Sequence, residues 1–89
     1  MKYIFIVNPA AGAGGTEEKL RAEIDALPEK ENCEIYVTKS VGDATDFVRS
    51  TIAGCKGEAL RFIACGGDGT INEVFSGAVG AENVSVTCY

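Results

Sequence analysis

A glycine-rich stretch, Gly66 to Thr70, holds the residues best suited to chemistry in this sequence of 89 residues. Three of its five residues are glycines, and the missing Cβ atoms would allow positive φ and let an anion approach the backbone amides closely. A helix is predicted to begin here, so its first turn would add free N–H groups and the positive end of the helix dipole. The pattern predicts a phosphate-binding loop that needs no lysine.

Asp68 lies inside this loop, which is an unusual position for a carboxylate beside a bound anion. Its carboxylate could take a proton from a nucleophile, assist a metal ion or hold the loop through hydrogen bonds. The alternative interpretation is a plain glycine-rich turn in which Asp68 only caps the helix. The turn alone does not decide between them.

Two common nucleotide-binding motifs are absent from the sequence. The segment from Gly12 to Glu17 reads GAGGTE, so the dinucleotide fingerprint GxGxxG fails at its last glycine. The motif GxxxxGK[ST] occurs nowhere in the chain. The protein is therefore predicted to be neither a classical Rossmann dehydrogenase nor a Walker-type NTPase.

Strand and helix patterns alternate along the chain. The predicted strands are Tyr3–Val7, Cys33–Thr38, Leu60–Cys65 and Val84–Thr87. The predicted helices run from Thr16 to Leu27 before Pro28, from Asp43 as N-cap to Gly54, and from the glycine-rich stretch to Ala78. Their apolar stripes are Leu20, Ile24 and Leu27, then Ala44, Phe47, Val48 and Ile52, then Ile71, Val74, Phe75 and Ala78. The order β-α-β-α-β-α-β predicts an α/β, Rossmann-like, three-layer nucleotide-binding domain with a parallel sheet.

The carboxyl ends of parallel strands are where such domains bind ligands. Three predicted loops follow strands at that edge, namely Asn8–Gly15, Thr38–Gly42 and Gly66–Thr70. We therefore expect the three loops to meet. Taken alone, the small residues after Asn8 indicate only a tight turn, and a threonine that ends a strand needs no special explanation.

Composition excludes several classes of partner. The chain has 13 acidic and 8 basic side chains, a net charge of −5 and a pI near 4.6, so nucleic acid is not expected as a partner. No apolar run is long enough for a membrane span or a signal peptide, which predicts a cytoplasmic protein that is peripheral to a membrane at most. The four cysteines form no CxxC pair and the chain has no histidine, so no metal site and no disulfide framework is predicted.

Three motifs together carry a family resemblance. The sequence has NPxxG at Asn8 to Gly12, Thr38 after the second predicted strand, and GGDGTINEV at Gly66 to Val74. This combination resembles the catalytic domain shared by diacylglycerol kinases, sphingosine kinases and bacterial diacylglycerol kinase-like lipid kinases. A bare GGDG also occurs in NAD kinases and, in variant form, in phosphofructokinases, whereas NPxxG with NEV is typical of the lipid kinases. Ala11 stands where the family often has serine.

The resemblance implies ATP and Mg²⁺ as cofactors. The implied ATP contacts are Asn8, Pro9, Gly12, Thr38, Gly66, Gly67, Asp68, Gly69, Thr70 and Asn72. Asp68 is the implied catalytic residue, because the matching aspartate is the base in the sphingosine kinase branch; in the bacterial branch the base lies in another domain. Glu73 and Val74 would serve helix packing and loop anchoring.

The resemblance also implies that residues 1–89 are the N-terminal part of a lipid kinase ATP-binding domain, without the β-rich C-terminal domain that binds lipid. We expect the whole enzyme to transfer the ATP γ-phosphate to a lipid hydroxyl, with diacylglycerol as the first candidate acceptor and phosphatidic acid as product. The segment alone should be inactive and should self-associate through its open sheet edge. The alternatives are an NAD kinase-like fragment and a noncatalytic nucleotide-binding module.

Overall fold

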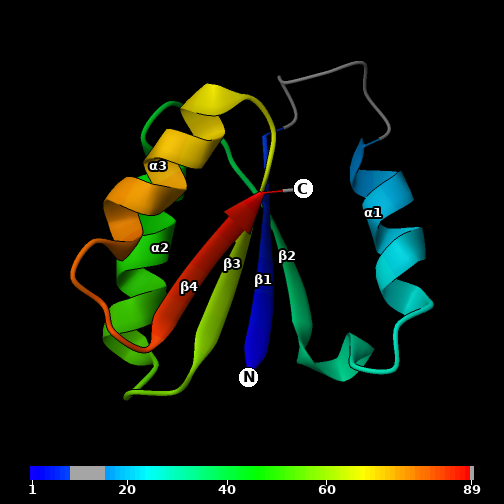
Figure 1. Ribbon diagram of the computed structural model, residues 1–89. Coiled ribbons are helices and arrows are strands. Elements are labelled where there is room, and N and C mark those ends of the chain that lie inside the picture. Colours follow the sequence, from blue (N-terminus) through cyan, green and yellow to red (C-terminus); the bar gives the residue numbers. More distant parts are fainter. Residues whose placement is uncertain (9–15, 89) are drawn as a thin grey trace.

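Four parallel strands form one sheet in the order β2-β1-β3-β4 (Figure 1). The computed structural model describes residues 1–8 and 16–88. The strands are β1 (Lys2–Val7), β2 (Cys33–Val37), β3 (Leu60–Cys65) and β4 (Val84–Cys88). The central pair β1 and β3 is in register from Lys2 opposite Leu60 to Val7 opposite Cys65, so both strands end at the same level. The predicted parallel α/β sheet is confirmed, with strand ends shifted by one residue at most.

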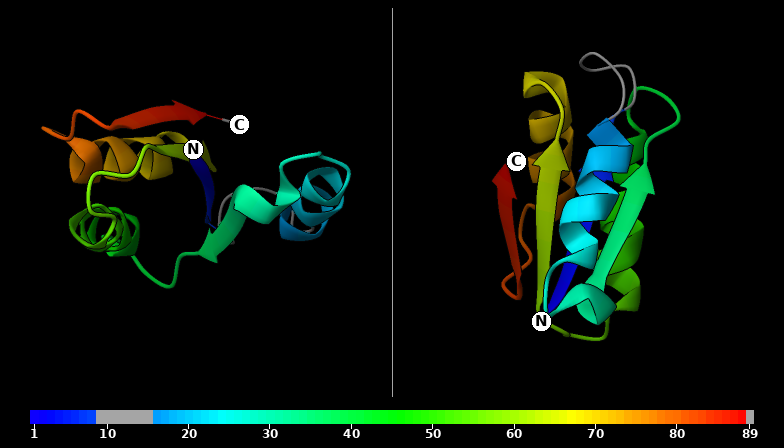
Figure 2. Two further views of the ribbon diagram at one scale, coloured as in Figure 1. Left: turned by 90° about the horizontal axis from the view of Figure 1, so that it is seen from below. Right: turned by 90° about the vertical axis from the view of Figure 1, so that its right-hand side faces the viewer.

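Helices cover both faces of the sheet, as the three-layer prediction requires. Helix α1 (Thr16–Asp25) lies on one face, and helices α2 (Asp43–Gly54) and α3 (Asp68–Ala78) lie on the other (Figure 2). A short 3₁₀ helix, η1 (Lys30–Asn32), leads into β2. Because the chain passes from β1 to β2 on one side and returns to β3 on the other, the connections change direction between β1 and β3. This switch point is where open α/β sheets bind ligands.

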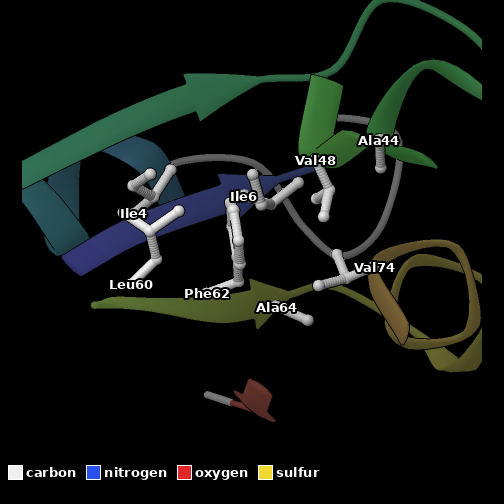
Figure 3. Packing of buried hydrophobic residues seen from close by; sticks show 8 residues of the cluster. All are labelled: Ile4, Ile6, Ala44, Val48, Leu60, Phe62, Ala64 and Val74. Atoms are coloured by element: carbon white, nitrogen blue, oxygen red, sulfur yellow. The ribbon is translucent and has the colours of Figure 1, made fainter. Parts of the chain in front are cut away.

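The core consists of one apolar cluster on each face of the sheet. The cluster beneath α2 and α3 contains Ile4, Ile6, Ala44, Val48, Leu60, Phe62, Ala64 and Val74 (Figure 3). The cluster beneath α1 contains Val7, Leu20, Ile24, Ile63 and Cys65. The strand side chains of both clusters alternate along β1 and β3, as the period of two in a strand requires. The larger cluster fixes α3 against the end of β3.

Two predicted core residues are exposed instead. Helix α1 ends at Asp25, and Leu27, which is 40% exposed, donates its amide to the Ile24 carbonyl in a closing turn (2.9 Å). The helical conformation is disfavoured for the residue before a proline, so Pro28 ends the helix early. Phe75 is 51% exposed, because the buried face of α3 is formed by Thr70, Val74 and Gly77.

Gly77 sets the distance between α2 and α3, although nothing in the sequence pattern marks it. A Cβ atom at this position would lie 2.8 Å from the Thr45 carbonyl oxygen and 2.8 Å from the Val48 Cβ atom. Neither neighbour can move cheaply, since one is backbone and the other a β-branched side chain in the core. The close approach of the two helices therefore depends on this glycine.

The edge strands of the described sheet differ in charge. On β2, Glu34 forms an ion pair with Lys2 (2.9 Å), whereas β4 has the sequence VSVTC and carries no charge. A charge on an edge strand discourages pairing with another chain. Self-association through an open edge stays a prediction, and β4 is the edge that fits it better.

Two further observations concern membrane-spanning helices and the cysteines. Among the helices of residues 1–8 and 16–88, none is long and apolar enough to cross a bilayer. Cys33, Cys55, Cys65 and Cys88 are all free thiols.

Candidate functional site

The ends of β1, β2 and β3 meet at one edge, where backbone bonds fix the residues that leave the strands. The Asn8 amide donates to the Cys65 carbonyl (3.2 Å), and the Thr38 amide donates to the Val7 carbonyl (2.8 Å). A cavity of about 240 Å³ opens beside these ends. Its lining residues are Asn8, Thr38, Lys39, Ser40, Val41, Ala44, Thr70 and Glu73. Three predicted site residues, one from each loop, thus share one cavity.

The glycine-rich loop lies next to this cavity and contains two kinds of glycine. A Cβ atom on Gly66 would lie 2.7 Å from Thr70 Oγ1 and 3.4 Å from the Asn8 Cβ atom, so this glycine lets the loop pack against its neighbours. A Cβ atom on Gly67 or Gly69 would meet no atom of residues 1–8 or 16–88 within 4 Å. Within the described part of the chain, the loop therefore leaves open space in front of these two residues.

The expectation of positive φ in this loop is wrong. Among the described glycines, positive φ occurs at Gly42, Gly57 and Gly80. The loop passes from the extended backbone of β3 directly into α3, and Gly67 has φ −82° and ψ −173°, a conformation open to any residue. Backbone conformation thus gives no reason for glycine at position 67.

The first turn of α3 presents free backbone donors at this place. The amides of Thr70 and Ile71 both donate to the Gly67 carbonyl (3.0 and 3.2 Å). In the described part of the chain, the amides of Asp68 and Gly69 have no backbone acceptor. Free amides at a helix N-terminus bind anions, and the helix dipole adds to the attraction.

Asp68 and Asn72 are exposed on α3 and do not line the cavity. They are four residues apart in the sequence and therefore share one side of the helix. The helix N-cap is Gly67, with no side-chain capping hydrogen bond. The interpretation of Asp68 as a capping residue is thus wrong, and its carboxylate is free to face a ligand. Pro9 and Gly12 lie outside the described residues.

The loop from β2 to α2 forms one wall of the cavity, and Asp43 holds it in a way that the sequence does not predict. Asp43 is not the N-cap; Gly42 is, at φ 87° and without a capping side chain. Asp43 instead accepts two hydrogen bonds on Oδ2, from the Tyr36 hydroxyl and the Lys39 amide (2.8 Å each). A glycine reaches positive φ at no steric cost, so the helix can begin one residue earlier than expected.

These hydrogen bonds shift the pKa of both side chains. The two hydrogen bonds that Asp43 accepts lower the pKa of its carboxyl group, because both donors favour the charged form. The Lys39 amide makes the larger contribution and the Tyr36 hydroxyl the next largest. The hydrogen bond to Asp43 raises the pKa of the Tyr36 phenol. The Tyr36 ring also stacks on Phe47, with ring centroids 3.8 Å apart and planes 5° from parallel. The Asp43 carboxylate is therefore ionised at neutral pH, and its two hydrogen bonds hold it in place.

Glu73 joins the same loop to α3. Its Oε1 accepts a hydrogen bond from the Gly42 amide (3.1 Å), and its carbonyl accepts one from Thr45 Oγ1 (2.8 Å). Val74 beside it is fully buried. Both residues thus do the packing and anchoring expected of them. Lys39, Ser40 and Glu73 line the cavity without having been predicted as ligand contacts. Lys39 and Ser40 lie in the loop after β2, and that position was their only signal. Glu73 lies within α3, and no sequence signal marked it as a cavity residue.

The chemistry on offer at this edge is binding and orientation. Burial raises the pKa of the Cys65 thiol, at the end of β3, to about 11, so this thiol is not a nucleophile at neutral pH. No three Asp, Glu, Cys or His residues of the described chain lie close enough together to hold a metal ion. The edge offers free backbone amides in the first turn of α3, the exposed carboxylate of Asp68, and a cavity wall that includes hydroxyl side chains, Lys39 and Glu73. This arrangement suits a phosphate group.

Comparisons with known proteins agree with this description. The sequence model of the diacylglycerol kinase catalytic domain matches residues 2–88. A crystal structure of a diacylglycerol kinase from Bacillus anthracis strain Sterne is 28% identical, with a TM-score of 0.65. Two structures of candidate diacylglycerol kinases from the same organism are each 29% identical, with TM-scores of 0.67. Each alignment covers 96% of this chain and 31% of the other chain. No curated protein matches the sequence.

Proposed function

Because the chain belongs to the diacylglycerol kinase catalytic domain family, we propose that it binds ATP with Mg²⁺ and forms the nucleotide-binding part of a lipid kinase. The chain spans about a third of the length of the kinase structures that it matches, 31% in each case. Residues 1–89 would therefore be the N-terminal part of the ATP-binding domain. The lipid-binding part would lie outside these residues.

The observation that carries this proposal is the open space over the glycine-rich loop. Among the described residues, none lies within 4 Å of a Cβ atom placed on Gly67 or Gly69, and none offers a backbone acceptor to the amides of Asp68 and Gly69. A phosphate placed there would take the unused donors and the helix dipole. The adjoining cavity of about 240 Å³ would take the nucleoside, with Asn8, Thr38 and Thr70 as contacts.

Phosphoryl transfer asks a protein mainly for positioning and charge stabilisation. In the proposed reaction the lipid hydroxyl oxygen forms a bond to the γ-phosphorus, the bond from that phosphorus to the ADP oxygen breaks, and the hydroxyl proton moves to a base. Asp68 is the proposed base on this chain, since its carboxylate is exposed beside the phosphate loop. The metal would enter with the nucleotide and neutralise charge on its phosphates.

Diacylglycerol is the proposed acceptor, which would make phosphatidic acid the product. Such an acceptor resides in a membrane, so we propose a cytoplasmic enzyme that binds peripherally to the membrane surface. The NAD kinase alternative rests on the bare GGDG string alone. The family match covers residues 2–88 and thus favours the lipid kinase.

The test follows labelled γ-phosphate from ATP and Mg²⁺ into either phosphatidic acid or NADP, with the protein made from its longest reading frame. We expect label in phosphatidic acid. Label in NADP would instead identify the protein as an NAD kinase, and nucleotide binding without phosphate transfer to either acceptor would favour a noncatalytic module.

A second test concerns the proposed base. Asp68→Asn should keep the ATP affinity and lose phosphate transfer. Unchanged phosphate transfer would contradict the assignment of Asp68 as the base.

A further inference from the structure

The β2–α2 loop is fastened at both of its ends. At its start, Asp43 Oδ2 accepts hydrogen bonds from the Lys39 amide and the Tyr36 hydroxyl, each 2.8 Å long. At its end, the Gly42 amide donates to Glu73 Oε1 of α3 (3.1 Å). The loop thereby reaches the same end of the molecule as the first turn of α3 (Figure 2). These bonds join β2, the loop, α2 and α3 into one unit.

Asp43 is unusual because its carboxylate bonds backward, away from its own helix. An acidic residue at the start of a helix commonly caps the free amides of that helix. Here the carboxylate spans four residues back to Lys39 and seven back to Tyr36, while Tyr36 is itself held by stacking on Phe47. The side chain that could have stabilised α2 is used to close the loop instead.

The closed loop supplies three consecutive residues of the cavity wall: Lys39, Ser40 and Val41. Val41 is 96% exposed, so little hydrophobic burial holds the middle of the loop in place. The hydrogen bonds at its ends are then the main constraint on its shape. A binding wall that is ordered before the ligand arrives spares the complex the entropy cost of ordering it.

We propose that Asp43 is a positioning residue for nucleotide binding, which keeps the β2–α2 loop in the shape that receives the nucleoside. This inference rests on the proposed function, because it takes the cavity to be the nucleoside site. It makes a specific division of roles: the glycine-rich loop binds phosphates, and the loop closed by Asp43 binds the rest of ATP. A ligand that has phosphates but no nucleoside should not depend on Asp43.

The experiment compares MgATP with inorganic tripolyphosphate plus Mg²⁺ by isothermal titration calorimetry. Asp43→Ala should raise the Kd of MgATP about tenfold and leave the Kd of tripolyphosphate within about twofold of the wild-type value. Asp43→Asn keeps a side-chain oxygen as acceptor, so its MgATP affinity should stay within about threefold of wild type. Asp46→Ala is the matched control, since it removes an exposed acidic residue from the same first turn.

The outcomes separate this inference from the proposed function. Equal loss of both ligands in Asp43→Ala, unchanged MgATP affinity, or an equal loss in Asp46→Ala would overturn the role of Asp43. Wild-type protein that binds neither ligand would overturn the proposed function itself. If Asp43→Ala does not fold, Tyr36→Phe removes one donor and keeps the ring that stacks on Phe47; it should raise the Kd of MgATP alone, by about threefold.

Discussion

The two ends of α3 use glycine for opposite reasons. At the first turn, a Cβ atom on Gly67 or Gly69 would touch no atom of the described residues within 4 Å. In the last turn, Gly77 is buried against α2, where a Cβ atom would lie 2.8 Å from both the Thr45 carbonyl oxygen and the Val48 Cβ atom. The close packing of α2 against α3 depends on Gly77, whereas no packing among the described residues depends on glycine at positions 67 and 69.

This difference separates a glycine that serves packing from two glycines that we propose serve a ligand. Neither Gly67 nor Gly69 has positive φ, so neither backbone conformation nor packing against the described residues explains the choice of glycine there. A group outside the chain that comes close to the backbone would explain it. The same helix thus allows one kind of substitution to be tested in two surroundings.

The largest effect is expected from Gly67→Val. The added side chain would occupy the space in which the proposed phosphate lies, so the affinity for MgATP should fall by at least about 100-fold. The backbone at Gly67 suits any residue, and the free energy of unfolding should therefore change by less than about 1 kcal/mol. Calorimetric titration and urea unfolding measure the two quantities.

Gly54→Val is the control for that variant. Gly54 ends α2, and its Cβ position is also open, but it does not line the cavity. It should bind MgATP like the wild type. Wild-type affinity in Gly67→Val would remove the phosphate loop from the proposal.

Gly77→Ala should lower the free energy of unfolding by about 1–2 kcal/mol, because overpacking between two helices outweighs the better helix propensity of alanine. Ser76→Ala, at an exposed position of the same helix, should be neutral or slightly stabilising. Urea unfolding at constant pH measures both. A Gly77→Ala variant as stable as the wild type would mean that α2 and α3 can separate at little cost.

Gly69→Ala makes the comparison sharper, since it is the same substitution in the same helix. With no neighbour to displace, it should raise the free energy of unfolding by up to about 1 kcal/mol. The methyl group would still crowd the proposed phosphate, so the Kd of MgATP should rise about three- to tenfold. Stability and affinity then move in opposite directions. Equal affinity together with higher stability would limit the ligand contact to Gly67.

The fold follows from local patterns to a large extent. The apolar run Leu60–Cys65 ends at a glycine pair, and the structure has a strand with those bounds. The third helix was predicted to end at Ala78, and α3 ends there; Gly80, directly after the C-cap Val79, has φ 87°, a conformation that favours glycine. Strand runs and helix stops depend on neighbours in the sequence, so they can be predicted without knowing the tertiary structure.

The errors arise where distant residues decide. Gly77 meets Thr45, 32 positions away in the sequence, and Glu73 anchors Gly42, 31 positions away. Asp43 is an exception, because its partners are near in the sequence: it has the residue type of an N-cap, but Gly42 caps the helix and the carboxylate bonds to Lys39 and Tyr36, four and seven positions back. The edge at which β1, β2 and β3 end beside the cavity was predictable from the order of strands and helices. The side chains of Lys39, Ser40 and Glu73 in the cavity wall were not.

The smallest expected effect concerns pH at the site end of α2. The folded-state pKa of Asp43 is lower than its ordinary value of 3.8, so the unfolded chain binds a proton first as the pH falls. Its contribution to stability is therefore complete above its unfolded pKa and is lost as the pH falls through the folded pKa. The stability advantage of the wild type over Asp43→Asn should be present at about pH 7 and should shrink towards about pH 3. Urea unfolding of both proteins at the two pH values measures this difference.

Tyr36→Phe removes one of the two donors to Asp43. It should lose part of the stability that the Asp43 carboxylate contributes at about pH 7. A stability advantage of equal size at both pH values would mean that the charge of Asp43 adds nothing to the stability of the loop. The site end of α2 would then depend on the shape of the Asp43 side chain alone, just as the other end of the α2–α3 pair depends on the shape of Gly77.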